Sequence, residues 1–301
     1  MFPKRKTASR RNRKRRTKYL WSVIKLNNRI QTIKEKAAVI RHAIVDMIGC
    51  TGKVGHLGGS SSIADIVAAL YFDQMKHDPH NPKAPDRDRF LLSKGHAALA
   101  QYAALAEAGY FSKDELKKVK HCGAMLQGHP DMNHTPGIEA NTGSLGQGLS
   151  LGLGMALGLK IDGNPAQVFV LMGDGEQAEG QIWEAAMAAA NFKTGNLIGI
   201  LDCNKVQAMG PVKDRMDSGD LKAKWASFGW HIIEIDGHDV EQILTALEQA
   251  RAYTAGPVLI FANTIKGKYI SFAEGNAAFH NGALTKEQYH QAHADIDRAA
   301  V

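Results

Sequence analysis

The segment VFVLMGDGEQAEG carries the sharpest chemical signal in the chain. An apolar run ends at Met172, a tight turn of two glycines surrounds Asp174, and a helical pattern follows. The glycine spacing differs from the GxGxxG dinucleotide fingerprint, and no phosphate-binding P-loop motif occurs. Because the Asp174 carboxylate would repel a phosphate unless a cation lay between them, this turn predicts a diphosphate bridged by Mg²⁺. The backbone of Gly175 could approach such a ligand closely.

Asn204 follows the next apolar run, LIGILD, thirty residues after Asp174. The ends of adjacent parallel strands lie about 5 Å apart, so the two side chains could bind one ion. Mg²⁺ takes about six oxygen ligands and often includes substrate phosphates among them. Taken alone, Asn204 could be an ordinary turn residue. Its pairing with the turn at Asp174 favours the metal site.

A second glycine-rich stretch is NTGSLGQGLSLGLGMALG. Its first part precedes a predicted helix, and there the backbone amides could hold a phosphate or a pyrimidine edge. The residues concerned are Gly143, Ser144, Leu145 and Gly146. The later glycines and alanines favour close helix packing, including packing across a dimer.

Four histidines lie in glycine-flanked loops: His56, His96, His129 and His280. A single loop histidine is usually an ordinary surface residue. Four of them, beside two loops of phosphate-binding type, predict proton transfer and hydrogen bonding to a polar, hydroxylated substrate. Zinc binding by cysteine and histidine within residues 121–134 is the alternative, but the spacings match no established zinc pattern.

The elements that must position these loops alternate between extended and helical patterns. Short runs rich in Val, Ile and Leu occur at 167–172, 197–202, 230–235 and 257–262, and helical patterns lie between them at 179–194, 221–228 and 239–253. This order predicts an α/β fold, a doubly wound and mostly parallel sheet with helices on both faces, as one domain over residues 28–301. Ligands of such sheets bind outside the carboxyl ends of strands, where the motifs lie.

Composition narrows the class of protein. The 301 residues are 44% hydrophobic and 22% charged, which excludes wholesale disorder, and no apolar run is long enough to span a membrane. The three cysteines lack CxxC spacing and indicate a reducing compartment, so we expect a cytoplasmic protein. Residues 1–18 hold ten Lys or Arg and no acidic residue, whereas the rest has 27 basic and 30 acidic residues. We interpret residues 1–27 as a basic, disordered extension, with nucleic-acid binding as the less favoured alternative.

The motifs together resemble transketolase, specifically its amino-terminal, thiamine-diphosphate-binding half. The resemblance covers residues 29–285 and rests on six segments in order: GHLGGSSS, DRFLLSKGHA, GHPDMNHTPGIEANTGSLGQGLS, GDGEQAEGQIWEA, LDCNKV and FHNGAL. It implies the thiamine-diphosphate-binding fold. Two departures, His-Leu-Gly for the commoner His-Pro-Gly and Cys203-Asn204 for Asn-Asn or Asp-Asn, remove no ligand.

The resemblance also implies roles for individual residues. The metal ligands would be Asp174, Asn204 and the main-chain carbonyl of Val206, holding Mg²⁺ or another divalent cation such as Ca²⁺ or Mn²⁺. Thiamine diphosphate would contact Gly143, Ser144, Leu145, Gly146, Gly175, His96 and His280. Sugar hydroxyls would contact His56 and His129, which complete a catalytic set with His96 and His280. Glu179 matches a buried acid in the network that links paired cofactors.

Length limits what the chain could do alone. Full-length transketolases have a second α/β domain that binds the aminopyrimidine and supplies the activating glutamate, and then a third domain; 301 residues leave room for neither. The resemblance therefore implies the amino-terminal subunit of a split transketolase, which moves a two-carbon ketol unit from a ketose phosphate to an aldose phosphate in the pentose phosphate pathway. It would act only with a carboxyl-terminal subunit, in a two-plus-two heterotetramer. The alternatives are a related thiamine enzyme, such as a 1-deoxyxylulose-5-phosphate synthase-like or specialised sugar transketolase, and a non-catalytic binding module.

Overall fold

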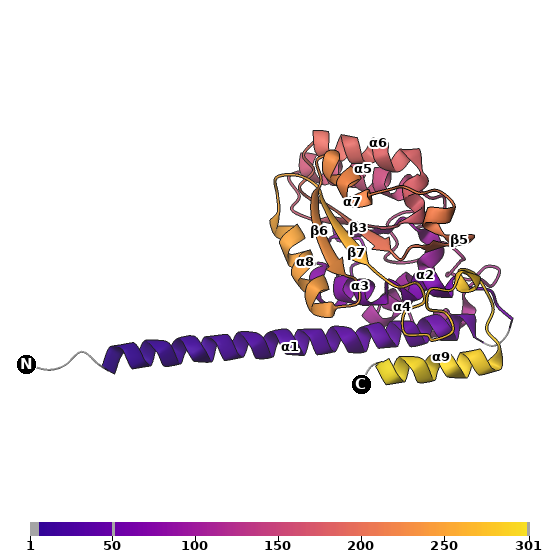
Figure 1. Cartoon of the computed structure of the whole chain (residues 1–301), viewed down its shortest axis with the longest axis horizontal. Helices are drawn as coiled ribbons and strands as arrows, with labels where there is room; N and C mark the ends of the chain where they lie inside the picture. Colours follow the sequence, from indigo (N-terminus) through magenta and orange to yellow (C-terminus); the bar gives the residue numbers. More distant parts are fainter. Residues whose placement is uncertain (1–5, 50–51, 300–301) are drawn as a thin grey trace, which may run out of the picture.

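A five-stranded parallel sheet forms the centre of the computed structural model, which describes residues 6–49 and 52–299 (Figure 1). The strands are β1 (Arg89–Leu92), β2 (Val168–Gly173), β3 (Leu197–Cys203), β6 (His231–Asp236) and β7 (Val258–Asn263), in the spatial order β1-β2-β3-β7-β6. Every pair in this sheet is parallel, and each predicted apolar run lies within a residue or two of a strand. The predicted α/β fold is confirmed.

Helices cover both faces of the sheet (Figure 1). One face is covered by α5 (Gln147–Ile161), α6 (Gly180–Asn191) and α7 (Leu221–Ser227), and the other by α1 (Lys6–Ile48), α3 (Ala64–Ala69), α4 (Ala98–Ala108) and α8 (Val240–Ala252). Each face forms a hydrophobic core with the helices that cover it. Because side chains alternate along a strand, Val168 and Val170 of β2 pack in the core below α5, α6 and α7, whereas Phe169 and Leu171 pack in the core on the opposite face. The two cores leave only the strand ends free for a site.

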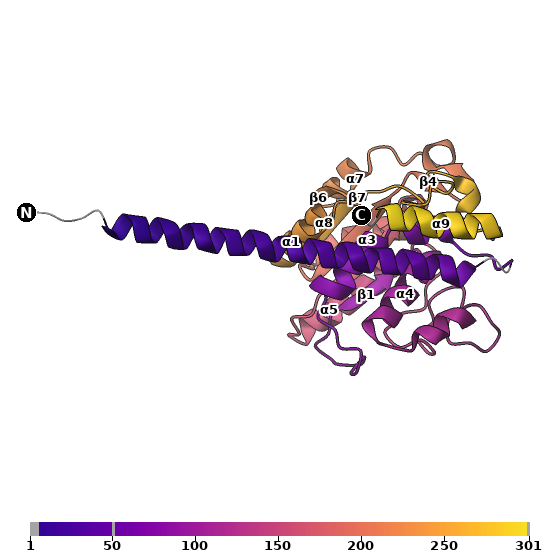
Figure 2. The same cartoon turned by 90° about the horizontal axis from the view of Figure 1, so that it is seen from below.

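Shorter elements lie in the connections. They are α2 (Leu57–Ser61), the π-helical turn η1 (Leu70–Gln74), the 3₁₀ turns η2 (Gly95–Ala97), η3 (Lys113–Lys118), η4 (Gly175–Ala178), η5 (Val212–Asp214) and η6 (Ala277–Phe279), and the antiparallel pair β4 (Val206–Gln207) and β5 (Gly210–Pro211). The last helix, α9 (Lys286–Ala299), lies beside α1 (Figure 2). Its His293 and His42 of α1 stack with ring centroids 4.9 Å apart.

Helix α1 includes most of the segment that was expected to be a disordered extension, and its amino-terminal part projects beyond the body (Figures 1 and 2). Residues 4–48 contain no glycine or proline, and Lys and Arg are good helix formers, so nothing in this segment ends the helix. Residues 1–27 were expected to be disordered, but residues 6–27 are helical. Residues 1–5 lie outside the described part of the chain. The division into an extension and a domain at residue 27 stays a prediction.

From Arg29 onward, α1 contacts the rest of the domain. The Arg29 guanidinium pairs with Asp73 and with Glu248, both at 2.7 Å. Further along, Ile33 and Ile40 lie on one face of the helix and are buried, as is typical of an amphipathic helix. In the described residues, no helix is both long enough and apolar enough to span a bilayer. Cys122 and Cys203 are free thiols, and Cys50 lies outside the described residues.

Candidate functional site

A cavity of about 150 Å³ lies at the carboxyl ends of β1, β2 and β3, where the glycine-rich loops meet. We call it the central cavity. Among the residues predicted for the site, those that line it are His96, Leu145, Asp174, Gly175, Asn204, Val206 and His280. The sheet thus brings together residues that are up to 184 positions apart in the sequence.

Asp174 lies in the turn after β2 and is only 5% exposed. Its Oδ1 accepts a hydrogen bond from the Gly175 amide at 2.8 Å, and its Oδ2 accepts one from the Lys205 amide. Burial and the neighbouring charge of Asp202 raise the pKa of Asp174 to about 6, although the two amides act in the opposite direction. A bound cation would lower the pKa of Asp174 again, because a nearby positive charge favours the ionised carboxylate.

Asn204 and Val206 follow β3 on the other side of the central cavity. Asn204 Oδ1 accepts a hydrogen bond from the Val206 amide at 3.1 Å, and its Nδ2 donates to Asp202 at 2.7 Å. The Val206 carbonyl accepts a hydrogen bond from the Lys266 ammonium at 3.0 Å. A positive group therefore already contacts one of the three predicted metal ligands.

The donor set suits a hard cation that shares its coordination with a ligand. In the described part of the chain, no three acidic, histidine or cysteine side chains form a metal-binding group. The three predicted ligands instead offer one carboxylate, one amide oxygen and one carbonyl. Mg²⁺ commonly binds in this way, with few protein oxygens and the remaining positions filled by phosphate oxygens and water.

A buried ion pair below the central cavity was missed by the sequence analysis. Lys94, two residues after β1, is 2% exposed, and its ammonium contacts Asp202 at 2.5 Å and the Gly59 carbonyl at 2.8 Å. Burial of Asp202 works against ionisation, but the charge and hydrogen bond of Lys94 hold the pKa of Asp202 below its usual range. The only available signal was the position of Lys94 at a strand end, in the SKGH motif.

An acid in the turn after β2 that the sequence did not single out, Glu176, is buried. Glu176 is 2% exposed and accepts hydrogen bonds from the Gly146 amide at 2.8 Å, the Gly173 amide at 3.1 Å and the Ser93 hydroxyl. Burial raises the pKa of Glu176. In this single chain Glu179 is exposed: it follows the 3₁₀ turn η4 and stands at the N-cap position of α6, where its side chain makes no capping hydrogen bond. The role expected for Glu179, in a network that links paired cofactors, concerns an assembly of chains and stays a prediction.

The loop Gly143–Gly146 leads into α5 with unusual backbone angles. Gly143 has φ +148° and Gly146 has φ +83°, a region that side chains with a Cβ rarely adopt. A Cβ at Gly143 would also lie 2.9 Å from the ring of His129. Leu145 faces the central cavity, but the Gly146 amide is already bound to Glu176. Gly146 therefore cannot donate that amide to a phosphate, as the sequence analysis expected, without breaking this bond.

The four predicted histidines converge from four different loops. The ring centroid of His56 lies 5.2 Å from that of His96, 5.3 Å from that of His280 and 6.3 Å from that of His129. Burial, assisted by neighbouring histidine and lysine charges, lowers the pKa of His56 to about 3, of His96 to about 2 and of His280 to about 4. Burial also lowers the pKa of His129. These rings are neutral near pH 7, so each offers one hydrogen-bond donor and one acceptor.

The histidine cluster predicts an acid-sensitive fold. The unfolded chain protonates these rings near pH 6.5, whereas the folded chain resists until much lower pH. Between these values the unfolded state binds more protons, so stability is retained above about pH 6.5 and lost as the pH falls. We expect His96→Gln, which cannot take up a proton, to lose about 2 kcal/mol less stability than the parent between about pH 7 and pH 5. Urea unfolding at both pH values measures this, and an equal loss in both proteins would contradict it.

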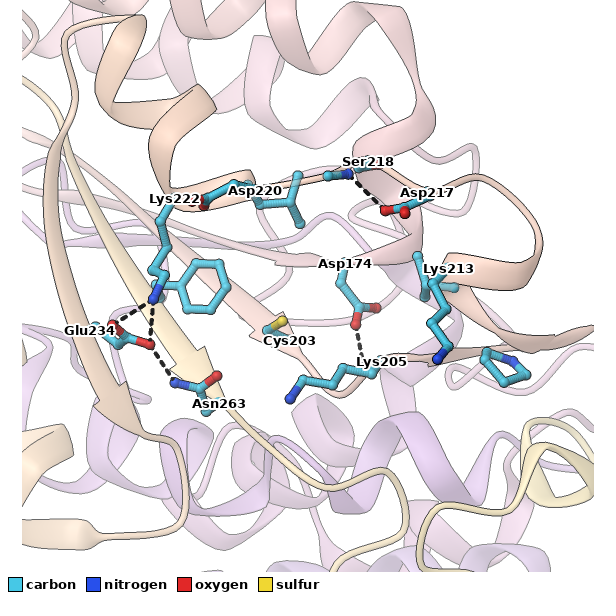
Figure 3. Close-up of a pocket in the computed structure, with 15 residues that line it drawn as sticks. Asp174, Cys203, Lys205, Lys213, Asp217, Ser218, Asp220, Lys222, Glu234 and Asn263 are labelled. Carbon is cyan, nitrogen blue, oxygen red and sulfur yellow. Dashed lines mark hydrogen bonds and ion pairs between the residues drawn. The ribbon is translucent and has the colours of Figure 1, made fainter.

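A larger neighbouring cavity, of about 470 Å³, lies on the other side of Asp174 (Figure 3). Lys222 crosses one end of it and pairs with Glu234, which accepts a further hydrogen bond from Asn263 (Figure 3). Asp174 is the only predicted site residue that lines this cavity. The central cavity, which Asp174 lines together with six other predicted site residues, is therefore the candidate site.

Comparison with known proteins decides the family. The family described as "Transketolase, thiamine diphosphate binding domain" matches residues 32–297, nearly the whole described chain. The chain belongs to the transketolase family. The transketolase of Campylobacter jejuni has a solved structure with a TM-score of 0.84 and 33% identity, which covers 89% of this chain and 43% of its own.

Two curated relatives have nearly the same length as the chain. The 6-deoxy-6-sulfo-D-fructose transketolase subunit SqwG of Clostridium sp. (strain MSTE9) is 47% identical over 266 residues, which are 88% of this chain and 96% of the relative. One subunit of the apulose-4-phosphate transketolase of Phocaeicola vulgatus is 39% identical over 267 residues, 89% of this chain and 94% of the relative. The chain therefore corresponds to the amino-terminal, thiamine-diphosphate-binding subunit of a split transketolase, a transferase.

Proposed function

We propose that the central cavity binds the diphosphate of thiamine diphosphate through a divalent cation held by Asp174, Asn204 and the Val206 carbonyl. The observation that carries this proposal is the convergence of these three oxygen donors on one cavity in a transketolase-family chain. Mg²⁺ fits the donor set, and Ca²⁺ or Mn²⁺ could use the same oxygens. When bound, thiamine diphosphate supplies an electron sink for cleaving the carbon–carbon bond beside a ketose carbonyl.

Two buried lysines support a strongly anionic ligand. Lys94 and Lys266 are each 2% exposed and both line the central cavity. Burial, together with the charge of Lys94, lowers the pKa of Lys266 to about 8. A diphosphate would stabilise the charged form of Lys266, because an opposite charge nearby restores protonation. We assign both ammonium groups to charge neutralisation, beside cofactor contacts from Gly143, Ser144, Leu145 and Gly175.

The neutral histidines suit a hydroxylated substrate. A neutral imidazole can donate to one hydroxyl and accept from another, whereas an imidazolium can only donate. We assign His56 and His129 to sugar hydroxyls, and His96 and His280 to the region between the diphosphate and the reacting carbon. His280 Nδ1 lies 3.1 Å from the Lys266 ammonium, which fixes the orientation of its ring.

The substrates are an anionic ketose donor and an aldose acceptor. The two relatives are named for a sulfonated and a phosphorylated sugar, so an anionic group remote from the reacting carbonyl is common to both. A phosphorylated ketose would place the enzyme beside the pentose phosphate pathway, and a sulfonated ketose would place it in sulfosugar breakdown. The greater identity to the sulfofructose enzyme favours the second substrate.

The partner is a carboxyl-terminal subunit that carries the pyrimidine-binding domain, in a two-plus-two assembly. The exposed position of Glu179 suits an acid that reaches a neighbouring subunit. We place the enzyme in the cytoplasm, with residues 1–27 as an extension outside the catalytic domain. Nucleic acid has no role in this proposal.

A substrate panel tests the proposed function. The chain, assembled with its carboxyl-terminal subunit, Mg²⁺ and thiamine diphosphate, is offered 6-deoxy-6-sulfo-fructose, fructose 6-phosphate, xylulose 5-phosphate and unsubstituted fructose, each with an aldose acceptor. We expect transfer from at least one anionic ketose and about 100-fold lower kcat/KM for unsubstituted fructose, which loses a charged contact of about 3 kcal/mol. Absence of transfer from every anionic ketose would contradict the proposal.

A further inference from the structure

A buried ion pair joins α1 to α3, which cover the same face of the sheet. Arg41 and Asp65 are each 3% exposed, and the guanidinium donates to both carboxylate oxygens of Asp65. Burial alone would raise the pKa of Asp65, but the charge of Arg41 and hydrogen bonds from His238 and Arg41 hold it below its usual range. Buried pairs of this kind are costly to break, because each partner would be left as an uncompensated charge. The carboxylate of Asp65 is therefore held in one position.

His238, in the turn between β6 and α8, binds the Asp65 carboxylate with one ring nitrogen and the Ile265 backbone amide with the other. Its Nδ1 lies 2.9 Å from Asp65 Oδ2, and its Nε2 lies 2.9 Å from the Ile265 amide nitrogen. The amide can only donate, so Nε2 accepts and the ring proton lies on Nδ1, from which it is donated to Asp65. A Cβ at Gly237 would lie 2.4 Å from Thr264 Cγ2, so this turn packs tightly against the segment it holds.

The held segment leads directly into the central cavity. Lys266 follows Ile265, and its ammonium reaches the Val206 carbonyl at 3.0 Å and His280 Nδ1 at 3.1 Å. On the far side, the Gly267 amide donates to the Gly58 carbonyl at 2.9 Å. The residues on both sides of Lys266 are therefore held through their backbone amides: Ile265 donates to His238, and Gly267 donates to Gly58.

We propose that His238, oriented by the Arg41–Asp65 pair, is a positioning residue that sets the Lys266 ammonium at the cofactor diphosphate. This inference rests on the proposed function, which puts the diphosphate in the central cavity. His238 itself does not line that cavity, so it acts through the Ile265 amide. The chain of contacts runs from Arg41 and Asp65 through His238 to Lys266.

Two substitutions separate the two hydrogen bonds of His238. His238→Gln places an amide near the position of Nε2 and can still accept from Ile265, whereas His238→Asn reaches only the position of Nδ1 and can still donate to Asp65. We expect His238→Asn to speed amide hydrogen exchange at Ile265 at least about tenfold, measured on the chain without cofactor. In the assembled enzyme, the Kd for Mg²⁺–thiamine diphosphate should rise about tenfold in His238→Asn and stay within about twofold of the parent in His238→Gln.

A double-mutant cycle with Lys266→Met distinguishes positioning from general stabilisation. If His238 acts through Lys266, adding His238→Asn to Lys266→Met should change the Kd by less than about twofold, because coupled residues are not additive. Full additivity, or equal weakening by His238→Asn and His238→Gln, would overturn the positioning role while leaving the proposed function intact. An unchanged Kd in Lys266→Met would overturn both the cofactor assignment of Lys266 and the role of His238. Melting temperatures of all variants show which of them remain folded.

Discussion

Replacing Asp174 by alanine should abolish Mg²⁺-dependent binding of thiamine diphosphate in the assembled enzyme. Asp174 is the only charged protein ligand in the proposed metal site, and its carboxylate is already buried beside Asp202. Without it, the cation has no anionic protein ligand and the diphosphate loses the bridge to the sheet. We expect affinity to fall by about 100-fold or more, since even residues behind the ligands cost about 10–100-fold. Calorimetric titration at constant Mg²⁺ measures the loss.

Two further variants define how the metal is held. Asn204→Ala should weaken binding less than Asp174→Ala, because it removes a neutral ligand that water can partly replace. Asp217→Ala is the matched control: Asp217 is an exposed carboxylate of the neighbouring cavity that accepts a hydrogen bond from the Gly219 amide, and its loss should leave the affinity unchanged. Unchanged cofactor affinity in Asp174→Ala would refute the metal bridge.

The purified chain alone should show no ketol transfer and should bind Mg²⁺–thiamine diphosphate weakly at best. Thiamine diphosphate becomes reactive only when a carboxylic acid holds its aminopyrimidine, so that the exocyclic amine can serve as the base. In the described residues, the buried acids around the central cavity already have partners: Glu176 binds backbone amides, Asp202 binds Lys94, and Asp174 is assigned to the metal. None remains for the aminopyrimidine.

Addition of a subunit that carries the pyrimidine-binding domain should create activity. Turnover of a donor ketose is followed at fixed chain concentration while the partner is titrated, and sedimentation reports the stoichiometry. We expect activity to saturate at one partner per chain, in a two-plus-two particle. Robust turnover by the chain without the partner would show that an activating acid lies within this chain.

The fold was readable from the sequence wherever burial on two faces leaves a continuous apolar run. Strands β3 and β7 lie within the two cores, so their runs of Val, Ile and Leu predicted both within a residue or two. The amino-terminal part of α1 was not predicted, because local helix propensity without an apolar face resembles a solvated, charged tail. The helix Leu57–Ser61 was also missed, since its glycines and serines are typical of a loop.

The site was partly readable for a similar reason. Asp174 and Asn204 stand at strand ends in a recognisable order, so the topology alone places them near each other. The interactions of Lys94 and Lys266 could not be derived, because their partners lie 108 and 60 positions away on other strand ends and loops. Glu176 was not singled out, because its burial depends on the 3₁₀ turn that directs it inward.

Helix α1 constrains how any larger particle can be built. Its 43 residues make a rod about 65 Å long, at about 1.5 Å per residue. The rod runs along the side of α3 and α8 and extends past the body, away from α5 and α6 (Figure 1). Subunits that meet through the α5–α6 side would therefore carry their rods on the outside. In a particle with twofold symmetry the two rods would point outward as a pair, which should lengthen the maximum dimension seen by small-angle scattering.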